Sequence, residues 1–389
     1  MQYRTLGKSG LRVSALGFGC MRLPTVGDDH SVIDQERATA MLDYALAHGV
    51  NYIDTAYGYH GGQSEPFVGR YLAETHQRDQ VLLATKMPVN LVEKPSDYDR
   101  IFEEQRERLR TEHLDLYLLH GLRGESWQRA VELGVIDWLD RRRAAGDIRH
   151  VGFSFHDDLA ALQRIITGYD HWDFCQVQYN YMNEDVQAGT PGVAFAANRG
   201  LGVVVMEPLL GGRLARPPEA VQAVWASSPR GWSAAEWALQ WLWHKPEISV
   251  VLSGMSTLEQ VQENVAAAAR SGVGTLTAQD LATVAAARER YQSLCPVPCT
   301  RCEYCMPCPN GVNIPGNLGL LNEGVMYGAM DEMRRRYAHM DEGARASACI
   351  QCRTCEDKCP QSIVISEWMP LVHAVLGEGR EFRPCDCPQ

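Results

Sequence analysis

Two short runs of cysteines near the C-terminus constrain this chain of 389 residues more than any other feature. The first run is Cys299-x2-Cys302-x2-Cys305-x2-Cys308-Pro309, and the second is Cys349-x2-Cys352-x2-Cys355-x3-Cys359-Pro360. Eight thiols in two closely spaced sets, each ending in Cys-Pro, form the ligand pattern of a pair of iron–sulfur clusters. Because a cysteine at every third position lets a short loop surround three corners of a cubane, this part of the chain is predicted to fold around two clusters.

The fourth cysteine of each run is expected to bind the cluster of the other run, as in two-cluster ferredoxins. The second run has the ferredoxin spacing, whereas the first is one residue short before its last cysteine. We therefore predict two [4Fe–4S] clusters, one held by Cys299, Cys302, Cys305 and Cys359 and the other by Cys349, Cys352, Cys355 and Cys308.

Zinc and disulfide bonds are the alternative uses of so many cysteines. A structural zinc ion usually takes two Cys-x2-Cys pairs, and a third regularly spaced cysteine with Cys-Pro is not needed for a tetrahedral site. Disulfides require an oxidising compartment, and the stretch from Met1 to Leu16 has no long apolar core of the kind found in signal peptides. The 13 cysteines therefore favour iron–sulfur clusters in a reducing cytoplasm.

Five further cysteines lie outside the two ligand sets. Cys20 and Cys175 stand in apolar, strand-like segments, where a free cysteine behaves as a small buried hydrophobe. The others are Cys295 and, near the C-terminus, Cys385 and Cys387. For the last two we weigh a frayed chain end against an extra pair of ligands, and favour the frayed end.

Charge and hydropathy argue against two classes of partner. Asp and Glu total 48 against 37 Lys and Arg, and the resulting net charge of −11 disfavours nucleic acid, which needs a basic surface. No run of about 18 apolar residues occurs, so a membrane span is not expected. The length of 389 residues is enough for one large and one smaller domain.

Short β-branched segments alternate with longer amphipathic ones over the first two-thirds of the chain. The predicted strands are Ala15–Phe18, Tyr52–Asp54, Val81–Thr85, Leu114–Leu119, His150–Phe153, Phe174–Gln178, Gly202–Val205 and Ile248–Leu252. The predicted helices are Asp34–His48, Glu65–Glu74, Asp97–Arg110, Trp127–Ala144, Asp157–Ile166, Asp185–Asn198, Ala234–Trp243 and Thr257–Ala269. Repeats of this kind over about 250 residues indicate an α/β fold, the (β/α)8 TIM barrel.

A doubly wound open sheet is the alternative to the barrel. That fold normally has fewer strands and carries Gly-x-Gly-x-x-Gly after its first strand, a motif missing from this chain. Ahead of the first repeat, Tyr3 to Val13 have the pattern of a hairpin around Lys8-Ser9-Gly10. Such a hairpin would cover the N-terminal end of the barrel.

The cysteine-bearing part is predicted to be a separate domain. A helix over Ala278–Leu294 leads out of the barrel, and Cys295-Pro-Val-Pro298 marks the boundary. The barrel is thus expected to span residues 1–294 and the iron–sulfur domain residues 295–389. Between the two cysteine runs, Ile314–Met340 has a mostly helical pattern, which favours a mostly α-helical ferredoxin-like domain over the compact ferredoxin sandwich.

Four ionisable residues stand at the ends of successive predicted strands. Catalytic groups of (β/α)8 barrels gather at this C-terminal face. The second strand ends at Asp54, with Tyr59 five residues later, the third ends at Lys86 and the fourth at His120. Each alone has an ordinary explanation, such as a helix cap or a solvent-facing lysine, but four at one mouth predict a catalytic site.

Five stretches carry a resemblance to a known family: Leu16-Gly-Phe-Gly19, Asn51-Tyr-Ile-Asp-Thr-Ala56, Leu83-Ala-Thr-Lys86, Asp115-Leu-Tyr-Leu-Leu-His120 and Gln176-Val-Gln-Tyr-Asn180. With the ordered Asp/Tyr/Lys/His set, they resemble the aldo-keto reductases over roughly two-thirds of the chain. Most of that family lacks the cysteine module. The whole chain resembles a branch of oxidoreductases with a C-terminal ferredoxin-type extension.

The resemblance implies that hydride passes from nicotinamide C4 to a carbonyl carbon and that a proton must reach the carbonyl oxygen. Tyr59 would be the general acid. Because a free tyrosine has a pKa of about 10, a buried Lys86 ammonium is expected to lower that pKa, with Asp54 holding the lysine in place. His120 would orient the carbonyl. Tyr57 is a competing acid, but the five-residue step from Asp54 favours Tyr59.

The cofactor side matches the family less well. Where family members usually hold the nicotinamide amide with Ser-Asn-Gln, this chain has Ser154, Phe155 and Gln176. Gln260 stands in place of an arginine often used for the 2′-phosphate of NADPH, and no Lys or Arg lies between Ile248 and Ala269. The amides that follow Ser256 at the start of a helix are then the expected pyrophosphate ligands.

The resemblance still implies a set of cofactor-binding residues. Met206 replaces the aromatic that usually stacks on the nicotinamide ring, and a thioether can also contact a ring face. The full implied set is Gly19, Met21, Ser154, Gln176, Met206, Pro208, Leu209, Gly254, Gln260 and Asn264.

Three functions fit the sequence. The first is a reductase for a carbonyl, alcohol or sugar-like substrate that uses NAD(P), with structural or electron-transferring clusters. The second takes single electrons from a ferredoxin-like partner, and FMN in the loops after strands seven and eight would then link the clusters to the substrate. The third is a non-catalytic electron-transfer subunit on a barrel scaffold.

Overall fold

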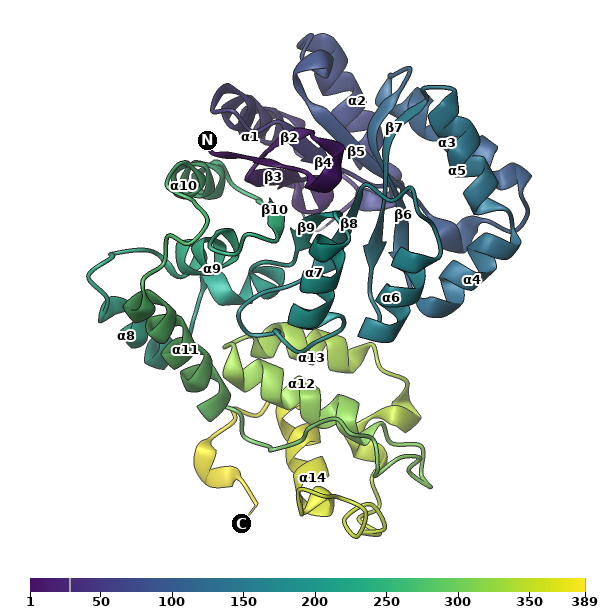
Figure 1. Cartoon of the computed structure of the whole chain (residues 1–389). Helices are drawn as coiled ribbons and strands as arrows, with labels where there is room; N and C mark the ends of the chain where they lie inside the picture. The colour runs from purple at the N-terminus through teal and green to yellow at the C-terminus, as the bar shows by residue number, and fades with distance from the viewer. Residues whose placement is uncertain (28, 389) are drawn as a thin grey trace. The chain divides into compact units, whose positions relative to one another are not determined.

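The computed structural model describes residues 1–27 and 29–388 and divides into two compact units (Figure 1). The first unit contains Met1–Gly211 and Ala235–Gln279, and the second contains Gly212–Ala234 and the described residues from Asp280 onward. The second unit thus includes two segments of the predicted barrel domain, Gly212–Ala234 and residues 280–294. The boundary predicted after residue 294 stays a prediction.

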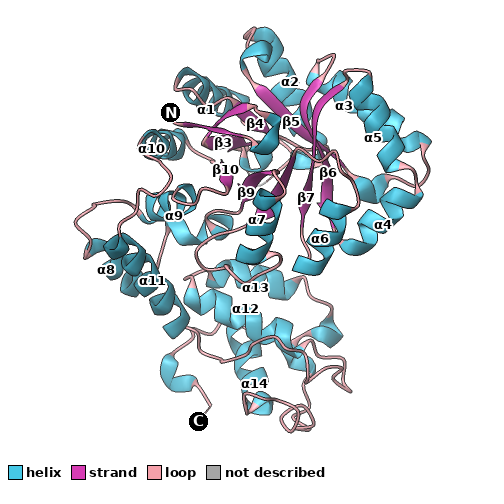
Figure 2. Ribbon diagram, viewed as in Figure 1, coloured by secondary structure: helices cyan, strands magenta, loops and turns pink. Residues whose placement is uncertain are grey.

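Eight parallel strands close into a barrel in the first unit, in the order β10-β3-β4-β5-β6-β7-β8-β9 (Figure 2). The (β/α)8 prediction is therefore confirmed, and each predicted strand is present within a few residues. Each strand forms main-chain hydrogen bonds with a neighbour on both sides, so the sheet has no unpaired edge strand. The strands are β3 (Leu16–Gly19), β4 (Tyr52–Asp54), β5 (Leu82–Met87), β6 (Leu114–Leu122), β7 (Ile148–Phe155), β8 (Phe174–Gln178), β9 (Gly202–Met206) and β10 (Ile248–Ser253).

Helices follow the strands around the barrel, as the amphipathic segments predicted. Two predictions differ from the structure. Trp127–Ala144 is two helices, because Gly134 adopts a φ of 79° between them, and the helix predicted from Asp185 begins only at Gly189. The helices are α1 (Gln35–Ala47), α2 (Ser64–Glu74), α3 (Ser96–Leu109), α4 (Gly124–Glu132), α5 (Val135–Ala144), α6 (Leu159–Thr167), α7 (Gly189–Asn198), α9 (Ala234–Trp243) and α10 (Leu258–Ala269).

The N-terminal hairpin covers one end of the barrel, as predicted. Its strands β1 (Tyr3–Thr5) and β2 (Arg12–Ser14) are antiparallel. Leu6 and Val13 are fully buried in a cluster with residues of the barrel interior. Leu6 lies so close to Gly202, at the start of β9, that a Cβ there would come within 2.4 Å of the leucine side chain. The opposite end, where the strands terminate, is left for the site.

The second unit is mostly helical and has its own apolar core. It contains α8 (Glu219–Ala226), most of α11 (Ala278–Ser293), α12 (Ile314–Met326), α13 (Met330–Ala338) and α14 (Ile365–Leu376). The helical prediction for Ile314–Met340 holds, with a break at Gly328, where φ is 62°. Leu318, Met369 and Val372 are fully buried in the core, and several cysteines pack against it. Helices α8 and α14 were not predicted from the sequence.

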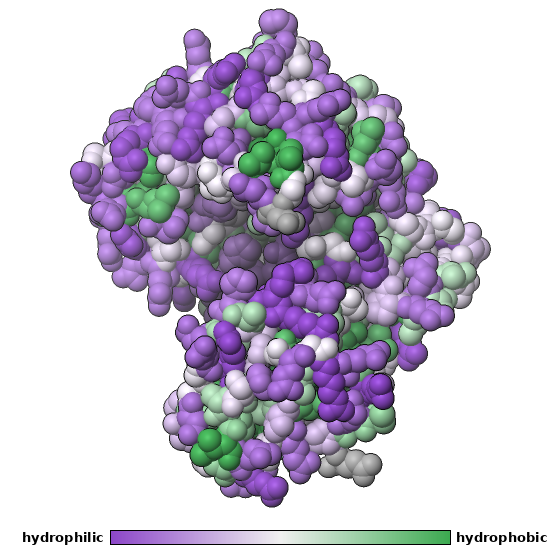
Figure 3. Space-filling view, turned by 180° about the vertical axis from the view of Figure 1, so that it is seen from behind, coloured by the Kyte–Doolittle hydropathy of each residue, from purple (hydrophilic) through white to green (hydrophobic). Residues whose placement is uncertain are grey.

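The visible surface in Figure 3 is mostly hydrophilic, with small separate apolar areas. Within the part of the chain that the structure describes, no helix has both the length and the apolar character needed to cross a membrane.

Candidate active site

Lys86 is the centre of the predicted tetrad. It lies near the end of β5, beside β4, whose last residue is Asp54. Its Nζ donates hydrogen bonds to Asp54 Oδ1 at 2.6 Å, to the Thr55 carbonyl at 2.8 Å and to the Tyr59 hydroxyl at 3.3 Å. Lys86 is completely buried and Asp54 is only 3% exposed. The structure thus brings three of the four predicted catalytic residues together.

Burial and charge act against each other in this pair. Burial raises the pKa of the Asp54 carboxyl, while the Lys86 ammonium acts in the opposite direction. Burial lowers the pKa of Lys86, but Asp54 and Tyr59 outweigh it and raise that pKa above its ordinary value. Lys86 therefore keeps its positive charge at neutral pH. Asp54 Oδ2 has no hydrogen-bond partner among the described residues, so the carboxylate's bonding is concentrated on the lysine.

Tyr59 begins a short 3-10 helix, η3 (Tyr59–Gly62), just beyond β4. Burial raises the pKa of its hydroxyl above the usual tyrosine value, and the charge of Lys86 offsets this only in part. Lys86 acts on this pKa in the expected direction, but burial is the larger effect and the net shift is upward. Tyr59 remains protonated at neutral pH, which is the state that a general acid requires. The competing residue, Tyr57, instead donates its hydroxyl to Glu104 Oε2 at 3.0 Å.

His120 lies in β6 and stands beside Tyr59. The two ring centroids are 6.0 Å apart, and the ring planes meet at 78°. Burial, followed by the positive charge of Lys86, lowers the pKa of His120 to about 3. The imidazole is therefore neutral at physiological pH, and it can donate one hydrogen bond without carrying charge.

A buried polar network lies behind Lys86. Glu65 Oε1 accepts hydrogen bonds from the Thr85 hydroxyl at 2.6 Å and from Gln105 Nε2 at 2.7 Å. Gln105 Nε2 also donates to the Lys86 carbonyl at 3.0 Å. Glu65 and Gln105 are both fully buried. Neither residue was predicted from the sequence, because the faces of α2 and α3 that meet β5 are set by packing and no sequence signal marks them.

Cys20, interpreted from the sequence as a small buried hydrophobe, is fully buried. It lies close enough to the tetrad to interact electrostatically with Asp54, Lys86 and Tyr59. Burial is the main effect that raises the pKa of its thiol. The thiol therefore stays neutral and contributes no charge to the site.

Residues implied for the nicotinamide side also lie together. Ser154 on β7 lies opposite Gln176 on β8. Gln178, also on β8, lies opposite Met206 on β9. The Ser154 hydroxyl accepts a bond from the Gly121 amide at 2.7 Å. Gln176 Nε2 is 3.7 Å from the Met206 sulfur, and its Oε1 is buried without a partner among the described residues.

The implied phosphate side is built from loops after β9 and β10. Gly19 packs against the second loop, since a Cβ on Gly19 would lie 3.3 Å from the Ser253 carbonyl oxygen. Pro208 is buried and Leu209 half-buried in the first loop, and Gly254 follows β10. Met21 is 59% exposed.

The side chains of Gln260 and Asn264, both on α10, form hydrogen bonds to Ser256 in the loop after β10 and to Ser253 at the end of β10. Gln260 Oε1 accepts from the Ser256 amide at 2.8 Å, and Asn264 Nδ2 donates to the Ser253 hydroxyl at 3.0 Å. Both side chains therefore stabilise the loop that starts α10.

The sequence profile of the aldo/keto reductase family matches residues 15–289, a span that includes the whole tetrad. The chain belongs to this family. It is an oxidoreductase on a (β/α)8 barrel.

Several relatives of this aldo/keto reductase cover its barrel. It is 28% identical over 326 residues to Protein tas of Escherichia coli, and the match covers 68% of this chain and 92% of that protein. It is also 28% identical over 289 residues to L-galactose dehydrogenase of Arabidopsis thaliana, covering 69% of this chain and 88% of the relative. The solved structure of aldo-keto reductase AKR11C1 from Bacillus halodurans, in its holo form, superposes with a TM-score of 0.62 at 27% identity. That match covers 74% of this chain and 96% of the other.

The cysteine runs of the reductase form two groups in the second unit. Cys299, Cys302, Cys305 and Cys359 line one cavity. Burial raises the pKa of Cys355 to about 11, and the cysteines close enough to add to this are Cys349 and Cys308. The last cysteine of each run thus lies with the other run. Among residues 1–27 and 29–388, no three His, Cys, Asp or Glu side chains are placed as ligands of a single metal ion.

The profile of a 4Fe–4S dicluster domain matches residues 298–364, which include every predicted cluster ligand. The chain therefore combines an aldo/keto reductase domain with a 4Fe–4S dicluster domain.

Proposed function

We propose that the protein interconverts a carbonyl and an alcohol on a hydroxylated small molecule, with NAD(P) as hydride carrier and Tyr59 as general acid or base. The observation that carries this proposal is the bonding of Lys86 Nζ to both Asp54 and the Tyr59 hydroxyl in a buried site. A tyrosine in this position can give up its proton during turnover, because the neighbouring ammonium stabilises the resulting phenolate.

The residues present fit a nicotinamide. The unpaired, buried Oε1 of Gln176 is an acceptor for an amide N–H, and the Ser154 hydroxyl lies on the neighbouring strand. The Met206 sulfur beside Gln176 offers a polarisable contact for a ring. When bound, NAD(P)H would supply the hydride.

Three side chains then handle the substrate oxygen. Neutral His120 donates a hydrogen bond that orients the carbonyl, and Tyr59 transfers its hydroxyl proton to the oxygen as negative charge develops there. Lys86 holds the Tyr59 phenolate until solvent returns the proton, and the reverse sequence oxidises an alcohol. Asp54 keeps the lysine charged and in place.

A polar cluster near His120 supports a hydroxylated, sugar-like substrate. His156 acts electrostatically on His120, and its Nδ1 lies 3.4 Å from Gln187 Nε2. Gln187 also donates to Gln178 Oε1 at 2.8 Å, while its own Oε1 is buried and unpaired among the described residues. Exposed Glu207 interacts electrostatically with His156. One relative is named L-galactose dehydrogenase, a name that also points to a sugar.

We propose that the two [4Fe–4S] clusters are held by the cysteine sets predicted above and either transfer electrons or stabilise a domain spanning residues 295–389.

The second candidate function, a cluster-fed reductase with a ferredoxin-like donor, is favoured by one observation. Phe155 is fully buried where family members usually place an amide for the nicotinamide, so hydride donor binding has lost one contact. FMN would then link the one-electron transfers of the clusters to the two-electron reduction of the substrate. For either candidate function, the cytoplasm is the proposed compartment.

The deciding experiment is an anaerobic titration with NADH or NADPH in separate cuvettes, followed by cluster absorbance and EPR. Bleaching shows that nicotinamide and clusters exchange electrons. Clusters that dithionite reduces but both nucleotides leave oxidised indicate a structural role or an external donor. In parallel, Tyr59→Phe should lower kcat by about 10²- to 10⁴-fold, as expected for loss of a general acid.

Tyr57→Phe is the matched control for that substitution. It also removes one hydroxyl, but its partner is Glu104 rather than Lys86. Equal losses in the two variants, or full activity in Tyr59→Phe, would contradict the assignment of the acid. Full cluster-to-acceptor electron transfer with no turnover of any carbonyl would support the non-catalytic alternative.

A further inference from the structure

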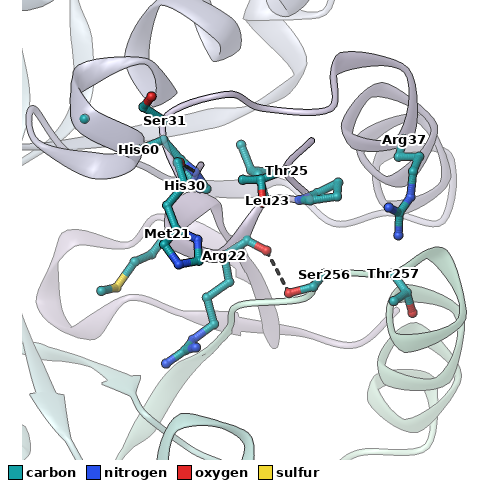
Figure 4. A pocket seen from close by; sticks show the side chains of 12 residues that line it. Met21, Arg22, Leu23, Thr25, His30, Ser31, Arg37, His60, Ser256 and Thr257 are labelled. Carbon is teal, nitrogen blue, oxygen red and sulfur yellow. Dashed lines mark hydrogen bonds between the residues drawn. The ribbon is translucent and has the colours of Figure 1, made fainter. Parts of the chain in front are cut away.

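A pocket of about 700 Å³ lies in the first unit, and Figure 4 shows the side chains that line it. His60 and Gly61, which directly follow Tyr59, line part of it. Ser256 and Thr257, where α10 begins, line another part. The volume is in the range of cofactor pockets. The pocket therefore connects the surroundings of Tyr59 with the loop after the last barrel strand.

Two main-chain amides at the start of α10 already have acceptors and are not available to an anion in this pocket. The Ser256 amide already donates to Gln260 Oε1, and the Gln260 amide donates to Thr257 Oγ1 at 3.3 Å. Glu259 adds a negative charge in the first turn. The expectation that these amides hold a pyrophosphate is therefore weakened, and the charge must come from elsewhere.

Arg22 brings positive charge to the pocket from η2 (Cys20–Arg22). A Cβ added to Gly254 would lie 3.1 to 3.3 Å from the aliphatic part of the Arg22 side chain. A Cβ added to Gly211 would lie 3.5 Å from Arg22 Nη2. These glycines belong to the loops after the seventh and eighth barrel strands, where (β/α)8 barrels commonly bind phosphate. The Arg22 side chain is exposed and has no carboxylate partner among the described residues.

Arg37 is the second guanidinium that lines the pocket. It extends from α1 toward Thr257 (Figure 4). The carboxylates near it are Asp34, whose Oδ2 is 3.9 Å from Arg37 Nη1, and Glu259, which interacts with it electrostatically. Exposed pairs of this kind are weak, so an incoming phosphate can compete for the guanidinium.

We propose that Arg22 and Arg37 supply the phosphate-binding charge that the α10 segment lacks. Arg22, across the two glycine loops, binds the pyrophosphate of a nicotinamide dinucleotide. Arg37, near Thr257, binds the 2′-phosphate that distinguishes NADPH from NADH. Guanidinium groups suit both tasks because their fork of N–H donors matches phosphate oxygens. The inference rests on the proposed function, since it assumes that a nicotinamide dinucleotide binds.

The test measures binding without turnover. Calorimetric titrations of the anaerobic full-length protein with NADPH, NADH and 2′,5′-ADP would compare wild type with Arg22→Gln and Arg37→Gln. Arg22→Gln should weaken NADPH and NADH alike, by about ten-fold or more, whereas Arg37→Gln should weaken only NADPH and 2′,5′-ADP by a similar factor. Arg199→Gln, an exposed arginine outside the pocket, removes the same charge and should leave each Kd unchanged.

The outcomes separate this inference from the proposed function. Wild-type binding of both dinucleotides with no change in either variant would overturn the arginine assignment alone. An equal loss of NADH and NADPH affinity in Arg37→Gln would overturn the assignment of the 2′-phosphate. Failure of the wild type to bind either dinucleotide would remove the nicotinamide part of the proposed function as well.

Discussion

Lys86 and Asp54 are almost completely buried and joined by a 2.6 Å bond, whereas Cys302 and Cys352 are exposed on loops of the second unit. The tetrad residues lie on or beside strands that a closed ladder of main-chain bonds holds in register. The cysteines lie on irregular segments between α11 and α14. One site is thus positioned by the fold, while the other depends on what it binds.

The backbone of the cysteine loops supports this contrast. In both runs, the residues on either side of the second cysteine are non-glycine residues in the left-handed region: Arg301 at 56° and Glu303 at 63°, and Gln351 at 56° and Arg353 at 63°. Such a conformation costs of order 1 kcal/mol or more for each residue and persists only where the surroundings require it. Cluster ligation by the intervening cysteines is the interaction that would require it.

Removing the clusters should have the largest effect. Oxidation with a chelator should abolish protease resistance around the cysteine runs, because metal-ligand bonds contribute on the order of 10 kcal/mol to small metal-dependent domains. The barrel should keep its own thermal transition, since β3 to β10 and their helices need no cluster. Limited proteolysis with mass spectrometry, together with calorimetry, would measure both. A barrel that melts together with the cysteine region would contradict the comparison.

Lys86→Met should have the next largest effect, and only in the barrel. It leaves the Asp54 carboxylate buried without its cation, which typically costs about 3 to 5 kcal/mol. Urea unfolding would give the change in the free energy of unfolding, and iron content should stay at the wild-type level. The double variant Asp54→Asn with Lys86→Met should recover part of the stability but none of the activity. Unchanged stability in the single variant would show that the pair is not buried in solution.

The sequence predicted the strands, the tetrad and the cysteine domain, but not the buried surroundings of the tetrad. The eight strands and the tetrad could be predicted because β-branched segments recur at regular intervals and their ends carry ionisable residues. The cysteine spacing likewise predicted the dicluster domain. Gln105 and Glu65 were not predicted, because their roles depend on which helix face meets β5, and the sequence does not specify that face. For the pKa of Tyr59, the sequence indicated the lysine but not the depth of burial.

The pH dependence of stability tests the electrostatics of the barrel site. The pKa of His120 falls to about 3 in the folded protein, below the ordinary histidine value of 6.5. Below pH 6.5 the unfolded chain takes up a proton that the folded chain does not, so stability is complete above pH 6.5 and falls as the pH decreases toward 3. The loss should approach about 1.4 kcal/mol per pH unit. Urea unfolding from pH 7.5 to 5 would measure it, with His120→Asn removing this part of the slope and exposed His48→Asn retaining it.

Glu65→Gln should have the smallest effect and shows how far the preformed geometry extends from the tetrad. The substitution keeps the size of the side chain but gives the Thr85 hydroxyl and Gln105 Nε2 a weaker acceptor, so stability should fall by about 1 to 2 kcal/mol. Gln105 also holds the Lys86 carbonyl, so a shift of β5 should lower kcat by a few-fold and leave KM nearly unchanged. Glu65→Asp retains the charge with a shorter reach and separates charge from position. If stability falls in Glu65→Gln while kcat and its pH profile stay at wild-type values, the network supports the fold but does not position Lys86.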